Sequence, residues 1–199
     1  MCFYSKQSKD AKKLEMRFKA KIVQLERFAK SNLFNGFEFP KTPVITNEDY
    51  SQIQMINWGL LPNWAYTDFD KKTTLNAKIE TLHKKPSFKD IIDNRCVIIV
   101  DGFYEWQHRG KEKIKYEIGF NNELFALAGL YDVNEGYKSY TIVTTEAKGI
   151  MREIHNTKLR MPFALRTDEE IYKWLNGEDV NPRFDFDVVP LNPIQPTLF

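Results

Sequence analysis

Cysteine is scarce in this chain of 199 residues: Cys2 and Cys96 are its two cysteines, and His83, His108 and His155 are its three histidines. Two cysteines cannot form a disulfide framework. Combined with three scattered histidines, they do not give the spacing of a four-ligand zinc site. We therefore expect a reduced protein that needs neither a metal nor another cofactor.

Long apolar runs are missing as well. No stretch approaches the roughly 18 to 20 residues that span a bilayer, and the N-terminal segment turns polar too early for a signal peptide. Internal repeats and low-complexity tracts are also absent. We expect a cytoplasmic monomer with no membrane partner, folded as a single domain over residues 1–199.

A strong excess of one charge is the third absence. The chain has 29 Lys and Arg against 27 Asp and Glu, which leaves a formal net charge of +2. This balance argues against a strongly basic protein that coats nucleic acid. It still allows a local basic groove, because phosphate binding depends on where the cations cluster.

Two helices are expected from the pattern of apolar and capping residues. Apolar side chains recur at steps of three or four from Asp10 onward, which predicts an amphipathic helix ending near Ser31. Farther along, Thr167 and Glu170 have the spacing of a capping box and predict the start of a helix. Gly177 is placed to end that helix.

Strands are expected over most of the rest. The segment 37–47 contains two prolines and predicts extended chain, and the Asn121–Asn122 pair predicts a hairpin turn between the strands on either side. Strands and irregularly placed helices together predict an α+β fold with a largely antiparallel, barrel-like β-sheet flanked by several helices. The expected strands are 52–59, 95–106, 114–120, 123–130 and 139–145.

Cys2 directly follows Met1, and removal of that methionine would expose an α-amine and a thiol on one residue. The amine has a pKa near 8 and the thiol near 8.5, so a useful fraction of each is nucleophilic at neutral pH. The alternative is that position 2 simply tolerates a small residue. Cys96 lies in an apolar strand segment and is assigned no role.

Three polar residues stand out in segments that otherwise look structural. Asn76 precedes a lysine, Glu105 lies between two aromatic residues, and His155 precedes Arg160 and a proline. Taken singly, each has a structural explanation: a helix cap, a half-exposed strand residue and a satisfied imidazole.

Taken together, these residues belong to motifs that resemble the SRAP (SOS response-associated peptidase) family. Members of that family shield abasic sites in single-stranded DNA by covalent attachment. The resemblance implies that Cys2 is the nucleophile once Met1 is removed, and that Asn76, Glu105 and His155 are catalytic. The motifs are Met-Cys at the start, WGLLPNWA (58–65), LNAKIET (75–81), DGFYEW (101–106) and IHNTKLRMP (154–162).

The resemblance also implies a set of DNA contacts. Tryptophan side chains stack on bases beside the lesion, and cationic side chains hold phosphates, as in sequence-tolerant single-strand binding. A proline before the early strand matches the family as well. The implied DNA-binding residues are Pro40, Trp64, Lys78, Trp106, Arg152 and Arg160.

The chain departs from the family pattern at several of these positions. Phe3 and Tyr4 stand where the family usually has glycine and a phosphate-binding arginine, and Lys78 replaces an arginine. Lysine keeps the charge but loses the bidentate fork. Between His155 and Arg160 the chain has residues 156–159, where a single residue is usual.

The implied reaction uses both functional groups of Cys2. His155 and Glu105 open the deoxyribose ring, the Cys2 amine forms a Schiff base with the aldehyde, and the thiol closes a five-membered thiazolidine. Asn76 fixes the Cys2 backbone and the sugar.

Two other functions stay open at this level. One is a cysteine hydrolase that uses Cys2 as thiol nucleophile and His155 as base, with removal of Met1 as its proteolytic event and a lyase activity as a further option. The other is a noncovalent single-stranded DNA binding module in which Cys2 is incidental.

Overall fold

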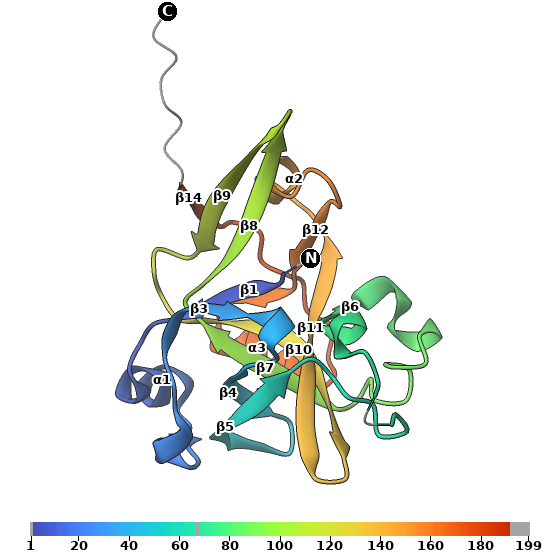
Figure 1. Ribbon diagram of the computed structural model, residues 1–199. Helices are drawn as coiled ribbons and strands as arrows, with labels where there is room; N and C mark the ends of the chain where they lie inside the picture. Colours follow the sequence, from blue (N-terminus) through green and yellow to red (C-terminus); the bar gives the residue numbers. More distant parts are fainter. Residues whose placement is uncertain (1, 67, 192–199) are drawn as a thin grey trace, which may run out of the picture.

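The computed structural model describes residues 2–66 and 68–191, which form an α+β fold with two β-sheets (Figure 1). Within these residues, the larger sheet has nine strands and the smaller sheet has five. Most neighbouring strands run antiparallel. The predicted fold class is therefore confirmed.

Five strands of the larger sheet form a closed ring in the order β10, β7, β4, β5 and β11. The ring closes because β11 pairs with β10 on one side and, in parallel, with β5 on the other. Strand β2 attaches to β5, β13 to β10, and both β6 and β12 to β11. The bounds are β2 Lys21–Ile22, β4 Lys41–Thr46, β5 Asp49–Trp58, β6 Asn76–Lys78, β7 Arg95–Val100, β10 Phe125–Asn134, β11 Tyr137–Glu146, β12 Arg160–Pro162 and β13 Ala164–Leu165.

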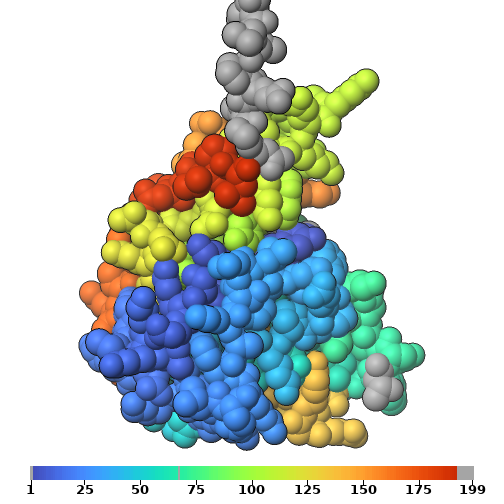
Figure 2. Space-filling view, turned by 60° about the vertical axis from the view of Figure 1, so that its left-hand side comes forward, coloured from blue at the N-terminus to red at the C-terminus, as the bar shows by residue number. Residues whose placement is uncertain are grey.

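The smaller sheet has the order β14, β9, β8, β1 and β3. Its apolar side chains share one buried cluster with side chains of the ring, so the two sheets pack on a common core. Figure 2 shows residues 2–50, in shades of blue, on a broad part of one face, below the red strand β14. The bounds are β1 Tyr4–Gln7, β3 Ser31–Asn35, β8 Gly102–Arg109, β9 Glu112–Gly119 and β14 Asp187–Pro190.

Residues 2–66 and 68–191 form three short α-helices that lie outside the sheets: α1 Ala11–Phe18, α2 Met151–Ile154 and α3 Asp168–Leu175. The capping box at the start of α3 is confirmed, since the Thr167 side chain and Glu170 exchange both hydrogen bonds. Gly177 follows the helix with a φ of +81°, as predicted for a residue that ends it. None of the helices in the described part of the chain has the length and apolar character needed to cross a bilayer.

Close packing inside the ring depends on Gly129. A Cβ at this position would lie 2.6 Å from the Ile98 side chain, 2.8 Å from the Thr141 carbonyl and 2.9 Å from Cys96 Sγ. Any larger residue would push β10 away from β7 and β11. On the same core, the buried Trp58 donates from its indole N–H to the Leu75 carbonyl at 3.0 Å, which fixes the chain that enters β6.

The predicted helix from Asp10 to Ser31 is wrong beyond its first two turns. Helix α1 ends at Phe18, because Lys19 adopts a left-handed conformation with φ 53°. The next residues form β2, which pairs with β5, and Ser31 begins β3. The apolar spacing that predicted a longer helix arises from a helix, a strand and the 3₁₀ turn Leu25–Arg27 in succession.

The predicted hairpin at Asn121–Asn122 is also wrong. Both residues have positive φ, as a tight turn requires, but the strands they connect belong to different sheets. The predicted strand 95–106 is two strands, β7 and β8. They are separated at Asp101, whose buried carboxylate accepts hydrogen bonds from the Ser8 backbone and hydroxyl.

The early strand predictions are closer to the structure. The expected strand 52–59 is present as β5. The expected extended segment 37–47 begins with the 3₁₀ turn Gly36–Glu38 and becomes extended in β4.

Candidate functional site

Cys2 lies two residues before β1 with no exposed surface, and it belongs to the core cluster shared by the two sheets. Asn76, the first residue of β6, donates from its side-chain amide to the Cys2 carbonyl at 2.9 Å. Strand β6 is held in turn by parallel pairing with β11. The structure therefore brings together Cys2 and Asn76, which are far apart in the sequence.

The side-chain oxygen of Asn76 is a buried hydrogen-bond acceptor. This atom, Oδ1, has no hydrogen-bond partner within residues 2–66 and 68–191. A buried acceptor without a partner costs free energy unless a ligand or a rearranged neighbour supplies a donor. Asn76 thus has one polar group that holds Cys2 and a second available for a donor nearby.

Glu105 and His155 form the second pair of the site. Glu105 projects from β8, and His155 caps the C-terminus of α2, which packs on β8. The Nε2 atom of His155 lies 3.7 Å from Oε2 of Glu105, and both side chains are more than nine-tenths buried. Glu105 also acts electrostatically on Cys2, where its charge raises the pKa of the thiol.

Burial changes the protonation of all three ionisable groups. It raises the pKa of Glu105 to about 7 and lowers the pKa of His155 to about 4. Burial, supported by the Glu105 charge, also raises the pKa of the Cys2 thiol far above its usual value. At neutral pH the thiol is protonated, the imidazole is neutral and Glu105 is close to half-protonated.

These pKa values distinguish the two residues to which the resemblance assigns ring opening together. Because His155 is buried, it is neutral at pH 7 and is a proton acceptor rather than an acid. The group that can donate a proton near pH 7 is Glu105.

The loop that carries His155 is fixed to β8 by two amide side chains that sequence reasoning missed. Gln107 donates to the Glu153 carbonyl at 3.0 Å. The Asn156 side chain accepts from the His108 N–H at 3.1 Å and donates to the His108 carbonyl at 2.8 Å. It thereby makes the two hydrogen bonds that the main chain of a neighbouring β-strand would make. The signal available in the sequence was only the position of Asn156 next to His155.

Arg160 has a partner that the sequence analysis did not identify. Its guanidinium makes a bidentate ion pair with Glu80, with N–O distances of 2.9 and 2.8 Å. Its side chain is 11% exposed. Glu80 belongs to the LNAKIET segment, two residues beyond β6, so both members of the pair lie in segments already singled out.

Trp106 is half-buried and forms part of an aromatic surface on β1 and β8. Its ring meets the Tyr4 ring edge to face at 5.0 Å. The Lys115 ammonium lies 4.3 Å from the Tyr104 ring centre and 5.6 Å from that of Trp106. Tyr4, at the position where the family usually has arginine, thus supports Trp106.

The remaining predicted DNA contacts lie on several elements. Trp64 is 52% exposed and meets Phe69 edge to face. Lys78 is exposed at the end of β6, and Arg152 is exposed on α2. Pro40 precedes β4, and its carbonyl accepts the Trp58 N–H at 2.8 Å, which suits a structural role. The contacts of these residues with DNA stay predictions.

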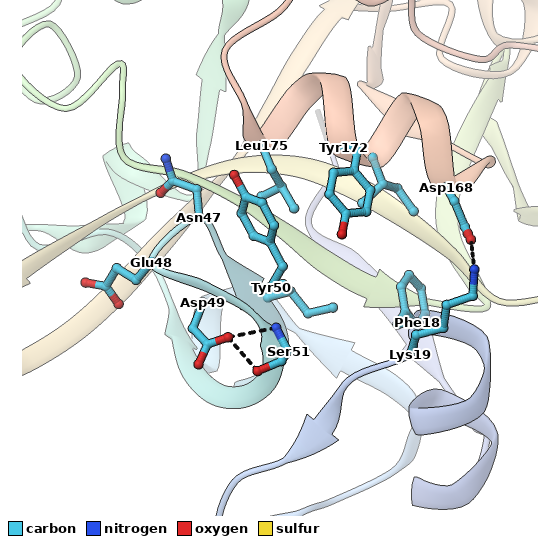
Figure 3. A pocket seen from close by; sticks show the side chains of 12 residues that line it. Phe18, Lys19, Asn47, Glu48, Asp49, Tyr50, Ser51, Asp168, Tyr172 and Leu175 are labelled. Carbon is cyan, nitrogen blue, oxygen red and sulfur yellow. Dashed lines mark hydrogen bonds and ion pairs between the residues drawn. The ribbon is translucent and has the colours of Figure 1, made fainter.

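A large cavity lies elsewhere, between the end of α1, the β4–β5 turn and α3 (Figure 3). Its volume is 690 Å³. Tyr50 and Tyr172 meet there edge to face at 5.4 Å, and Lys19 pairs with Asp168 across the rim at 2.8 Å. The cavity is lined by none of the predicted site residues.

The family model of the SOS response associated peptidase (SRAP) matches residues 1–193. The chain therefore belongs to the SRAP family, as its motifs implied.

Individual relatives agree with this assignment. "Abasic site processing protein YoqW" of Bacillus subtilis is 38% identical over 149 residues, which are 71% of this chain and 65% of that protein. "Abasic site processing protein HMCES" of Gallus gallus is 34% identical over 158 residues, 64% of this chain and 46% of that protein. The chain thus spans less than two thirds of the length of these curated relatives.

A solved structure is similar over nearly the whole chain. The crystal structure of a protein from Bacteroides thetaiotaomicron superimposes with a TM-score of 0.85 at 33% identity. The similarity covers 96% of this chain and 92% of that one.

Proposed function

We propose that this protein senses and shields abasic sites in single-stranded DNA by forming a covalent bond between Cys2 and the deoxyribose. The observation that carries the proposal is the convergence of Cys2, Asn76 and the Glu105–His155 pair at one buried site. The names of YoqW and HMCES, both abasic site processing proteins, support the same substrate.

Removal of Met1 comes first. While Met1 is attached, the Cys2 nitrogen is an amide whose lone pair is delocalised into the carbonyl. Removal converts it to a primary amine, whose lone pair is free to attack a carbonyl. The buried Asn76 Oδ1, which has no partner among the described residues, is suited to accept a hydrogen bond from that amine or from the sugar.

Ring opening uses the acid and the base of the buried pair. Protonated Glu105 donates its proton to the ring oxygen of the hemiacetal, and neutral His155 accepts the proton of the C1′ hydroxyl at Nε2. The bond between C1′ and the ring oxygen breaks, which gives an aldehyde and a 4′-hydroxyl. The proton on His155 can return to Glu105 across the short gap between them.

Bond formation then uses both functional groups of Cys2. The amine adds to C1′ to give a carbinolamine, which loses water to form a Schiff base. The thiol, kept protonated by burial, adds its sulfur to C1′ and delivers its proton to the nitrogen. The product is a five-membered thiazolidine, and its intramolecular closure benefits from a large effective concentration.

Single-stranded DNA is the form of substrate that the exposed groups favour. The exposed Trp64 and the half-buried Trp106 offer ring faces for unpaired bases, and Lys78 and Arg152 offer exposed cations for phosphates. A thiolate hydrolase is less consistent with the site. Burial keeps the Cys2 thiol protonated, whereas a cysteine hydrolase needs a thiolate.

The test is incubation of the purified protein with single-stranded DNA containing one abasic site, followed by a denaturing gel without added reductant. We expect a slow-migrating adduct with wild type and none with Cys2→Ala, which keeps the amine but lacks the ring-closing thiol. Cys96→Ala is the matched control, because it removes the other buried cysteine and should leave the adduct. An adduct that persists in Cys2→Ala would contradict the proposal.

A further inference from the structure

The two halves of the site are joined by an ion pair between Glu80 and Arg160. We propose that Glu80 is a positioning residue for His155 and acts through Arg160. This inference rests on the proposed function, because it assigns Glu80 a part in the same reaction. Glu80 binds the Arg160 side chain, and the Arg160 main chain contacts the His155 ring, so the effect of Glu80 on His155 is indirect.

The side chain of Arg160 is anchored at three points. Its guanidinium meets both carboxylate oxygens of Glu80 and donates to the Thr144 carbonyl at 2.7 Å. A planar guanidinium held by a bidentate carboxylate and a carbonyl has little rotational freedom. Burial opposes ionisation of Glu80, but its hydrogen bonds and ion pair with Arg160 hold the pKa of Glu80 below its ordinary value. Glu80 is therefore ionised at neutral pH.

The main chain of Arg160 holds the ring of His155. The Nδ1 atom of His155 lies 2.8 Å from the Arg160 carbonyl oxygen and 3.1 Å from the Arg160 nitrogen. One residue thus offers Nδ1 both an acceptor and a donor. When Nδ1 carries a proton it donates to the carbonyl, and when it does not it accepts from the N–H.

This arrangement controls the other ring nitrogen. With Nδ1 protonated and bound to the carbonyl, Nε2 is left unprotonated and faces Glu105 as a base. With Nδ1 accepting from the N–H, Nε2 carries the proton. The position of the Arg160 main chain therefore determines whether Nδ1 of His155 has a hydrogen-bond partner both when it carries a proton and when it does not.

Pairing of β12 with β11 and the hydrogen bond from the Leu159 N–H to the His155 carbonyl already hold the main chain near Arg160, and the ion pair with Glu80 adds a side-chain anchor. Residues 156–159 separate His155 from Arg160, so chain connectivity alone does not set their distance. Glu80 supplies the anchor from the segment that begins with Asn76, the residue that holds Cys2. The ion pair thus ties the strand that positions the nucleophile to the strand that positions the imidazole.

The same contacts distinguish positioning from phosphate binding. A guanidinium that is 11% exposed and already bound by Glu80 and Thr144 has few donors left for a phosphate. Loss of Glu80 should then slow the reaction of bound DNA rather than weaken binding.

The experiment measures single-turnover adduct formation at saturating protein with Glu80→Ala and Glu80→Gln. We expect Glu80→Ala to be slower by roughly 10-fold, as for a displaced catalytic group. Glu80→Gln, which keeps a hydrogen-bond acceptor for Arg160, should fall between Glu80→Ala and wild type. Affinity for intact single-stranded DNA should stay within about twofold, a small change for a residue that does not contact phosphate. Glu123→Ala, which removes an exposed ion pair with Arg166, is the control and should react at the wild-type rate.

A second readout reports on the ring of His155 directly. Nitrogen NMR of the imidazole gives the protonation of Nδ1 and Nε2, and we expect Glu80→Ala to shift both signals while Glu123→Ala leaves them unchanged. If Glu80→Ala does not fold, Arg160→Lys replaces it, since lysine keeps the charge and the main chain but loses the fork. It should cause the same slowing and the same ring shifts.

The outcomes separate this inference from the proposed function. Wild-type rates and unchanged ring signals in Glu80→Ala would overturn the positioning role. The positioning role would also be overturned if Glu80→Ala bound DNA more weakly but formed the adduct at the wild-type rate at saturating protein. That result would assign the Glu80–Arg160 ion pair to the DNA-binding surface. If wild type forms no adduct, the proposed function fails, and the NMR comparison still decides whether Glu80 positions His155.

Discussion

The Nε2 atom of His155 and the Oε2 atom of Glu105 lie 3.7 Å apart, and both side chains are buried. Because burial moves their pKa values in opposite directions, to about 4 and about 7, the pair holds a base and an acid at neutral pH. Two titratable groups whose environments separate their proton affinities in this way are suited to acid–base chemistry.

Substitution of either member of this pair should slow chemistry more than binding. We expect Glu105→Gln and His155→Ala to reduce the single-turnover rate of adduct formation by roughly 10²-fold, a typical loss for a general acid or base. Affinity for intact single-stranded DNA, measured by fluorescence anisotropy, should change by no more than a few fold. Wild-type rates at saturating protein would show that neither residue transfers a proton.

The pH dependence should identify Glu105 as the acid. Protonated Glu105 is the reactive form, so the rate advantage of wild type over Glu105→Gln should be largest below pH 7 and shrink above it. The ratio of the two rates cancels the titration of the Cys2 amine, which both proteins share. A ratio that is constant from pH 5.5 to 8.5 would assign the acid to another group.

Burial of Glu105 should also cost stability when the carboxyl ionises. Its folded-state pKa is raised, so the protonated form is favoured on folding and stability falls as pH rises from the unfolded pKa toward 7. Above pH 7 the loss is at most about 3.5 kcal/mol, from about 1.4 kcal/mol per pKa unit and the rise from 4.5 to about 7. We expect Glu105→Gln to be more stable than wild type at pH 8, and the difference to shrink at pH 5, in urea titrations. A Glu105→Gln protein less stable than wild type at pH 8 would refute this assignment.

DNA binding should respond to salt and to the exposed cations. On single strands, each phosphate contact contributes roughly −0.7 to the slope of log K against log salt. Lys78→Ala should therefore make the slope shallower by about one contact, whereas Trp64→Ala should weaken binding without changing the slope. Tighter binding to intact duplex than to single strands would argue against stacking on unpaired bases.

Local features of the fold could be predicted where local chemistry decides the outcome. The capping box of Thr167 and Glu170 is present, because both partners lie within one helical turn. The longer helix was wrong because its end at Lys19 is followed by strand pairing with Ile53, a distant residue that the periodicity does not include. Asn121 has the positive φ of a turn, but the sheets it connects depend on pairing across the whole chain.

In the site, too, local motifs could be predicted and contacts between distant residues could not. Motif resemblance identified Cys2 and Asn76, and the structure joins them by a hydrogen bond. The low pKa of His155 was not predictable, because it results from burial by segments remote in the sequence. The partner of Arg160 was missed for the same reason, because Glu80 lies 80 positions away and no sequence pattern links the two residues.

The most direct test of the account is the mass of the peptide that carries the DNA. Trypsin digestion of the adduct, after nuclease trimming, should yield a peptide that begins at Cys2 and ends at Lys6, without Met1 and with the deoxyribose attached. This result would place the covalent bond on the N-terminal cysteine, as the account predicts. A deoxyribose found on a lysine, or on a peptide that retains Met1, would contradict it.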